Sequence, residues 1–132
     1  MPVKNYPFTS IRKDDLARPY LPITIENPST NKKMDVYALI DTGADECAMP
    51  ASFASILGHN LQNGIIKKIG TGNGITVAYG HTTKILLEGF STQEVVIDFV
   101  PNLSTPLIGV KSFLSNFILS INYPNKTFSL DL

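Results

Sequence analysis

The sequence is divided into short apolar runs, separated by clusters of glycine, proline and asparagine. Runs of this length predict β-strands, and the residues between them predict turns. The predicted strands cover residues 21–26, 34–40, 65–69, 75–79, 82–87, 93–100, 118–121 and 127–130. Many short strands at close spacing are typical of a barrel or sandwich, and a length of 132 residues suits one domain. We therefore expect a single all-β domain.

Three other segments carry weaker patterns. Residues 50–58 predict a short helix, because Pro50 suits a first helical position and Gly58 suits an end. Residues 110–117 predict a second short helix. Residues 1–19 are polar and contain several prolines, so we expect an amino-terminal arm with at most a helical turn at 14–18. The folded domain is then expected to span residues 20–132.

The charge and cysteine content exclude several classes of function. Eleven basic and eleven acidic residues cancel, and no long basic run offers a surface for nucleic acid or an anionic membrane. The lone Cys47 cannot form an intrachain disulfide and favours a reducing, cytoplasmic compartment for a soluble protein. We expect it to be buried and inert. His59 and His81 lack ligand partners at metal-site spacing, so we expect surface or loop histidines, no metal and no cofactor.

An acidic residue, Asp41, directly follows the apolar end of the strand predicted at 34–40. Such a carboxylate is expected to be partly buried, which is costly unless it has partners. Gly43 permits an unusual backbone angle in a tight loop, and Thr42 offers a hydroxyl that can brace it. These features suit a preorganised carboxylate. A simple turn at a strand end is the alternative explanation of Asp-Thr-Gly by itself.

The context of this tripeptide favours the first explanation. The segment 38–45 (Ala-Leu-Ile-Asp-Thr-Gly-Ala-Asp) resembles the catalytic loop of the retropepsin family, the retroviral and cellular aspartic peptidases. Residues 69–75 are similar to the tip of the family's flap. Residues 107–109 (Leu-Ile-Gly), followed by Phe113-Leu114, resemble its second glycine motif and helix. The resemblance covers roughly residues 20–130 and is closest to cellular and bacterial members, including the retropepsin domain of DNA-damage-inducible ubiquitin-shuttle proteins.

The resemblance implies a retropepsin-like closed barrel with one or two short helices, which forms a twofold homodimer. Asp41 is then the catalytic carboxylate, in an active-site loop that includes Thr42, Gly43 and Ala44. Thr42 would bond across the dimer, with simple turn capping as the alternative. Asp45 would accept hydrogen bonds from substrate amides, with a solvated surface acid as the alternative. The implied substrate-binding residues are Asp45, Gly70, Thr71, Gly72, Asn73, Gly74 and Ile108. A core role is an alternative for Ile108.

The chain also departs from the retroviral pattern. It has a longer amino-terminal arm and extra residues after the second predicted helix, and Val110 stands where retroviral members often have arginine. A buried ionic brace of the retroviral dimer is therefore expected to be absent.

Aspartic peptidase chemistry requires two carboxylates that share a proton and act on one water molecule. Asp-Thr-Gly occurs once in this sequence, at Asp41, so the second carboxylate must come from another copy. We therefore expect a homodimer. The arm of residues 1–19 is expected either to pack against this dimer or to be removed by self-cleavage.

Three functions remain open from the sequence. The first is an aspartic endopeptidase that cleaves extended polypeptide segments, with a preference for apolar residues beside the cleaved bond. The second is a catalytically silent retropepsin-like module that dimerises or binds peptide. The third is a small β-barrel that carries a non-peptide ligand, which predicts a monomer with an enclosed apolar cavity.

Overall fold

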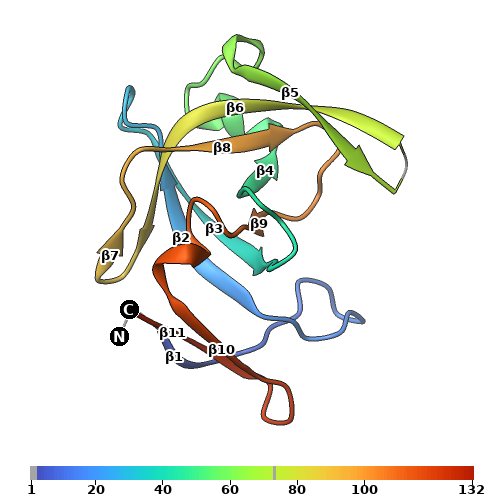
Figure 1. The fold of residues 1–132 in the computed structure, drawn as a ribbon, viewed down its shortest axis with the longest axis vertical. Helices are drawn as coiled ribbons and strands as arrows, with labels where there is room; N and C mark the ends of the chain where they lie inside the picture. Colours follow the sequence, from blue (N-terminus) through green and yellow to red (C-terminus); the bar gives the residue numbers. More distant parts are fainter. Residues whose placement is uncertain (1–2, 73) are drawn as a thin grey trace.

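The computed structural model describes residues 3–72 and 74–132 and contains two β-sheets (Figure 1). The larger sheet has the strand order β2-β3-β9-β4-β8-β6-β5, and β7 pairs with β6. A further pairing between β2 and β6 joins the two sides of this sheet, so it closes into a barrel. Its strands are β2 (Tyr20–Glu26), β3 (Lys33–Ile40), β4 (Ala48–Pro50), β5 (Ile65–Thr71), β6 (Gly74–Leu87), β7 (Phe90–Ser91), β8 (Val95–Val100) and β9 (Leu107–Ile108).

The barrel is filled by the apolar residues that alternate along its strands. In β2, Leu21, Ile23 and Ile25 are buried, whereas the residues between them are partly exposed. This alternation follows from the two-residue repeat of a strand, which sends neighbouring side chains to opposite faces. The largest fully buried side chains include Phe99, Phe113, Phe128, Met49, Ile85 and Ile97. The predicted all-β fold is confirmed.

The longest strand, β6, joins two segments that the sequence predicts as separate strands, 75–79 and 82–87. Gly80 lies between these two segments. In the structure a Cβ at Gly80 would lie only 2.8 Å from Val96 Cγ1. The glycine therefore serves close packing inside a continuous strand, which pairs with β5, β8, β7 and β2 along its length.

The first predicted helix is confirmed, with a shifted start. Helix α1 spans Ser52–Ile56, whereas Pro50 ends strand β4 instead of opening the helix. Gly58 follows with φ of +79°, the left-handed conformation in which glycine commonly ends a helix. A short 3-10 helix, η1 (Leu61–Asn63), comes next.

The helix predicted for residues 110–117 is wrong over most of its length. Turns cover the first part, and only a 3-10 helix, η2 (Leu114–Asn116), is formed. The Asn116 side chain donates a hydrogen bond to the Phe113 carbonyl at 2.9 Å, which competes with helical bonding. Burial of Phe113 and Leu114 fixes this compact turn.

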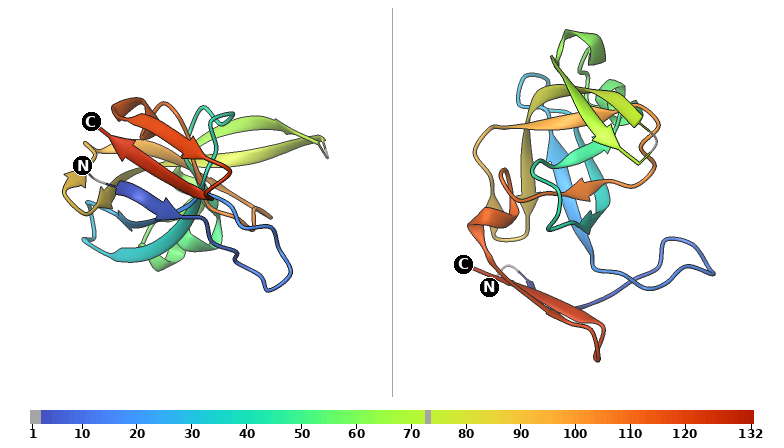
Figure 2. Two further views of the ribbon diagram at one scale, coloured as in Figure 1. Left: turned by 90° about the horizontal axis from the view of Figure 1, so that it is seen from below. Right: turned by 45° about the vertical axis from the view of Figure 1, so that its right-hand side comes forward.

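The amino-terminal segment expected as an arm docks on the carboxy-terminal part of the chain. Strand β1 (Val3–Pro7) pairs with β11 (Thr127–Asp131), which also pairs with β10 (Ile118–Asn122), and Val3 is buried. A bridge between Thr9 and Arg18 then closes a loop, and no helical turn forms at 14–18. Figure 2 shows the resulting three-stranded sheet at one end of the molecule, with this loop projecting from it. The hairpin predicted at 118–130 is confirmed.

Candidate active site

The loop that carries Asp41 lies where β9 is inserted between β3 and β4 (Figure 1). Ile40 pairs with Ile108 in parallel, and Ala48 pairs with Leu107 in the antiparallel sense. The Asp41 N–H donates to the Ile108 carbonyl at 3.0 Å. Two motifs far apart in the sequence therefore meet in one site.

The Asp41 carboxylate is half-buried and is held by the backbone of its own loop. The Gly43 N–H donates a hydrogen bond to Asp41 Oδ1 at 3.0 Å, and the Ala44 N–H donates to the Asp41 carbonyl at 3.1 Å. A Cβ on Gly43 would lie 3.3 Å from Oδ1, which is tighter than ordinary contact. One carboxylate oxygen is therefore fixed, while Oδ2 has no partner in the part of the chain that the structure describes.

A second glycine, Gly109, lets the chain pass directly beneath the Asp41 loop. A Cβ at Gly109 would overlap the Glu46 carbonyl and lie 2.9 Å from the Ala44 carbonyl oxygen. The next two residues donate backbone hydrogen bonds to this loop. The Val110 N–H donates to the Ala44 carbonyl at 2.9 Å, and the Lys111 N–H donates to the Asp45 carbonyl at 2.8 Å. The loop is thus bonded to the chain on both sides of Gly109.

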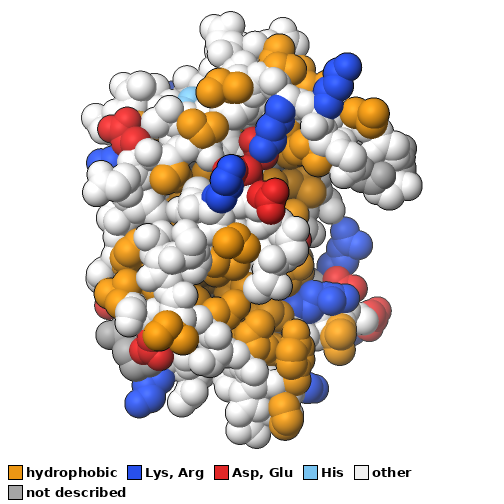
Figure 3. Space-filling view, in the orientation of Figure 1, with side chains coloured by type: hydrophobic (Ala, Val, Ile, Leu, Met, Phe, Trp, Pro, Cys, Tyr) orange, Lys and Arg blue, Asp and Glu red, His pale blue; other side chains and the backbone are white. Residues whose placement is uncertain are grey.

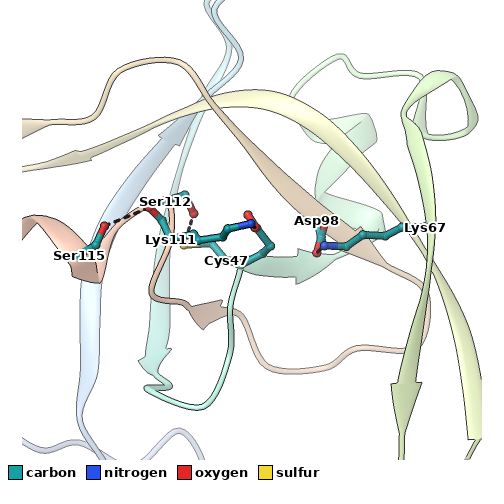
Figure 4. Close-up of polar contacts among 7 residues, drawn as sticks. Cys47, Lys67, Asp98, Lys111, Ser112 and Ser115 are labelled. Atoms are coloured by element: carbon teal, nitrogen blue, oxygen red, sulfur yellow. Dashed lines mark hydrogen bonds and ion pairs between the residues drawn. The ribbon is translucent and has the colours of Figure 1, made fainter.

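Cys47 ends the loop and lies fully inside the protein. Its Sγ accepts a hydrogen bond from the Gly109 N–H at 3.3 Å. It accepts a second one from Ser112 Oγ at 3.2 Å (Figure 4). Burial raises the pKa of the thiol, although these two hydrogen bonds oppose the effect. A buried, protonated thiol is a poor nucleophile, which agrees with the structural role expected for Cys47.

Thr42 and Asp45, which the sequence assigns to the site, are both exposed. Neither side chain makes a hydrogen bond or ion pair with another described residue. They are therefore free to contact a substrate or a second copy, and their assigned roles stay predictions. Ile108 is fully buried, which agrees with the core role given as its alternative. Its contact with substrate also stays a prediction.

The predicted flap corresponds to the hairpin of β5 and β6, which projects from the barrel (Figure 1). Gly70 and Gly72 near its tip are exposed, and Gly74 has φ of +108°, which the turn requires. Asn73 and the Thr71 side chain lie outside the described residues. In Figure 3 the projecting part overhangs a notch in the molecular surface.

Two ion pairs near the loop were not anticipated from the sequence. Lys67 Nζ lies 2.8 Å from Asp98 Oδ2, and Lys111 Nζ lies 3.5 Å from Glu46 Oε1. Figure 3 shows acidic and basic side chains meeting near the middle of this face, among hydrophobic ones. An acid inside the apolar run 95–100 is the signal that could have revealed the first pair, because a buried carboxylate needs a partner.

His59 lies in a loop, as expected, whereas His81 lies within strand β6 and is not a loop residue. The rings of His59 and His81 lie 4.5 Å apart, and both rings contact Phe99. Burial, and secondarily the charge of His81, lower the pKa of His59 to about 4. Asn27 Nδ2 lies 3.3 Å from His59 Nδ1, which suits donation to a neutral ring, whereas the buried Nε2 has no described partner.

Residues 27–116, more than half of the chain, match the family described as gag-polyprotein putative aspartyl protease. The chain belongs to this family. The match contains the whole Asp41 loop and the Gly109 motif that supports it. A comparison with curated protein sequences gave no match.

Solved structures confirm that the fold is retropepsin-like. A retropepsin-like aspartic protease from Rickettsia conorii aligns with a TM-score of 0.65 at 20% identity, covering 83% of this chain and 89% of that one. The retroviral protease-like domain of Ddi1 from Leishmania major gives 0.60 at 20% identity, covering 89% and 90%. The EIAV protease complexed with the inhibitor HBY-793 gives 0.51 at 17% identity, covering 82% and 93%.

The described residues contain no group of three or more histidine, cysteine, aspartate or glutamate side chains arranged to hold a metal ion. None of their helices combines the length and hydrophobicity that crossing a membrane demands.

Proposed function

We propose that this protein is an aspartic endopeptidase whose active form is a homodimer with one Asp41 from each copy. The observation that carries the proposal is the Asp41 loop itself. One oxygen of its carboxylate is fixed by the Gly43 N–H, and the other is unpaired within the described residues. Family membership supports assigning protease chemistry to this carboxylate.

The chemistry requires the two carboxylates to share one proton. The ionised carboxylate takes a proton from a water molecule, whose oxygen attacks the carbonyl carbon of the peptide bond. The protonated carboxyl group gives its proton to the carbonyl oxygen, so a tetrahedral diol forms. Proton transfer to the amide nitrogen then lets the C–N bond break, and the products are a carboxylic acid and an amine.

The backbone hydrogen bonds around Asp41 would act by preorganisation. The Gly43 N–H stabilises negative charge on Oδ1, and the Ile108 carbonyl holds the Asp41 backbone. Because these groups are already aligned, little reorganisation would be needed when a second carboxylate approaches. Thr42 is proposed to bond across the dimer, from its exposed position beside Asp41.

Substrate would bind as an extended strand between the Asp41 loop and the projecting hairpin, which serves as the flap. Main-chain hydrogen bonds would give affinity, and side-chain pockets would give preference. Asp45 is exposed and suited to accept amide hydrogen bonds, and the hairpin exposes Ile75 at 76% near its tip. This apolar surface supports a preference for apolar side chains beside the cleaved bond. Gly70, Gly72 and Gly74 would allow the flap tip to approach the peptide. We place this activity in the cytoplasm, which the single buried cysteine favours.

The test is cleavage of a peptide library at mildly acidic pH by the natural chain and by Asp41→Asn. We expect cleavage by the natural chain and a loss of at least about 10³-fold in the variant, because one shared proton and one base disappear. Circular dichroism and peptide binding should be unchanged. Binding without any cleavage by the natural chain would instead identify a silent peptide-binding module.

A further inference from the structure

The Lys67–Asp98 ion pair joins two strands that are not neighbours. Lys67 lies on β5 opposite Ala78 of β6, and Asp98 lies on β8 opposite Gly80 of β6. Opposed residues share a face of a sheet, and residues two apart on one strand share it too. All four residues therefore lie on one face. The lysine can cross β6 because alanine and glycine offer it no large side chain (Figure 4).

The two partners differ in their exposure to solvent. The Asp98 side chain is 6% exposed, whereas the Lys67 side chain is 43% exposed. A buried carboxylate is stable only when it is paired, whereas an exposed ammonium can be hydrated by water. Asp98 therefore depends on Lys67 more than Lys67 depends on Asp98. Because Lys67 lies on β5, a movement of β5 away from β8 would leave the buried Asp98 carboxylate without its partner.

Asp98 is also bonded to the segment that ends the Asp41 loop. Its N–H donates to the Cys47 carbonyl at 2.9 Å, and Ala48 pairs with Asp98 in parallel. Cys47 Sγ in turn accepts from the Gly109 N–H. A continuous set of short contacts thus leads from the hairpin strand β5, through Asp98, to the residues that support the catalytic loop.

We propose that the Lys67–Asp98 ion pair positions the flap above the catalytic loop, so that Lys67 and Asp98 are positioning residues for peptide binding. Among the described residues it is the one ion pair that ties the β5–β6 hairpin to the strands beneath it. The ion pair fixes the base of the hairpin, and the glycine-containing tip remains free to close over the peptide. This inference rests on the proposed peptidase function only for its kinetic effect. The mechanical effect on the hairpin can be measured without any activity.

The experiment compares Lys67→Met with Lys68→Met. Lys68 is the matched control, since it lies next on the same strand, opposite Val77, and makes no described ion pair. We expect Lys67→Met to speed amide hydrogen exchange in residues 65–70 by about tenfold and Lys68→Met to leave it unchanged. In the peptidase assay, Lys67→Met should raise KM about tenfold while kcat changes less than about twofold. Lys67→Arg, which keeps the cation, should restore both quantities.

Asp98→Asn tests the same contact without leaving an unpaired buried charge. It replaces Lys67→Met in the experiment if that variant does not fold. It should also speed exchange in the hairpin, by less than Lys67→Met does, because an amide can still accept from Lys67. Equal exchange in the natural chain, Lys67→Met and Asp98→Asn would overturn the inference. If the natural chain cleaves no peptide, the proposed function fails, whereas the exchange comparison still decides whether the ion pair positions the hairpin.

Discussion

The role of Asp41 can be inferred from the sequence, whereas the packing role of Gly109 cannot. Asp41 is visible as an acid at the end of an apolar strand, with a glycine two residues later. Gly109 is visible only as part of a short motif. The sequence cannot show that its missing side chain admits the Glu46 and Ala44 carbonyls, because this contact joins segments distant along the chain.

Replacement of Gly109 by alanine should destabilise the fold. The new methyl group would overlap the Glu46 carbonyl, and backbone atoms cannot move away as a flexible side chain can. We expect the free energy of unfolding, measured by urea denaturation, to fall by about 2–3 kcal/mol. The control is Gly70→Ala, where no atom lies within 4 Å of the added Cβ, and its change should stay within about 1 kcal/mol. Equal effects at both positions would contradict this packing argument.

The elements that the sequence predicted well are those whose pattern is local. The alternation in β2 and the turn residues between β10 and β11 belong to single short segments. The elements that the sequence did not predict are formed by contacts with segments distant along the chain. Strand β1 has little apolar pattern and forms because β11 offers it an edge, while β9 is only two residues long and is defined by its neighbours β3 and β4. Segment 110–117 is shaped by the burial of Phe113 and Leu114.

Removal of residues 1–19 should weaken the protein, because β1 contributes to its packing. Val3 is buried, and the rings of Tyr6 and Phe8 lie 5.6 and 6.5 Å from that of Phe128. We expect a chain starting at Tyr20 to lose roughly 3 kcal/mol or more of unfolding free energy in urea. The double variant Ile11→Ser, Leu16→Ser changes exposed residues of the neighbouring loop and should lose little. Unchanged stability of the shortened chain would show that β1 is dispensable.

The histidine pair between α1 and β6 should make stability depend on pH. His59 has a pKa of about 4 in the folded protein and about 6.5 when unfolded, so the unfolded state binds the proton more readily. Its contribution to stability is therefore complete above about pH 6.5 and is lost as the pH falls toward 4. We expect the unfolding free energy of the natural chain to fall more steeply across this window than that of His59→Gln. Parallel pH profiles for the two proteins would be the contrary result.

At the scale of the whole molecule, the catalytic proposal depends on association. A single copy holds one Asp-Thr-Gly loop, and the chemistry requires two carboxylates. The initial cleavage rate should therefore rise roughly as the square of protein concentration below the dissociation constant of the dimer, and linearly above it. A tandem chain with two linked copies is the control and should give a linear rate throughout. Linear scaling by the natural chain, down to a monomer proven by sedimentation, would exclude the dimer mechanism.

The order of the central strands also has a consequence for biosynthesis. The loop after β3 is supported by β9, which is made much later in translation, and closure of so long a separation is slow. A nascent chain that has emerged from the ribosome only as far as residue 106 lacks the backbone that holds the loop. For the proposed peptidase, synthesis of the chain would therefore precede assembly of the Asp41 site, and a copy that ends before β9 would lack a supported carboxylate.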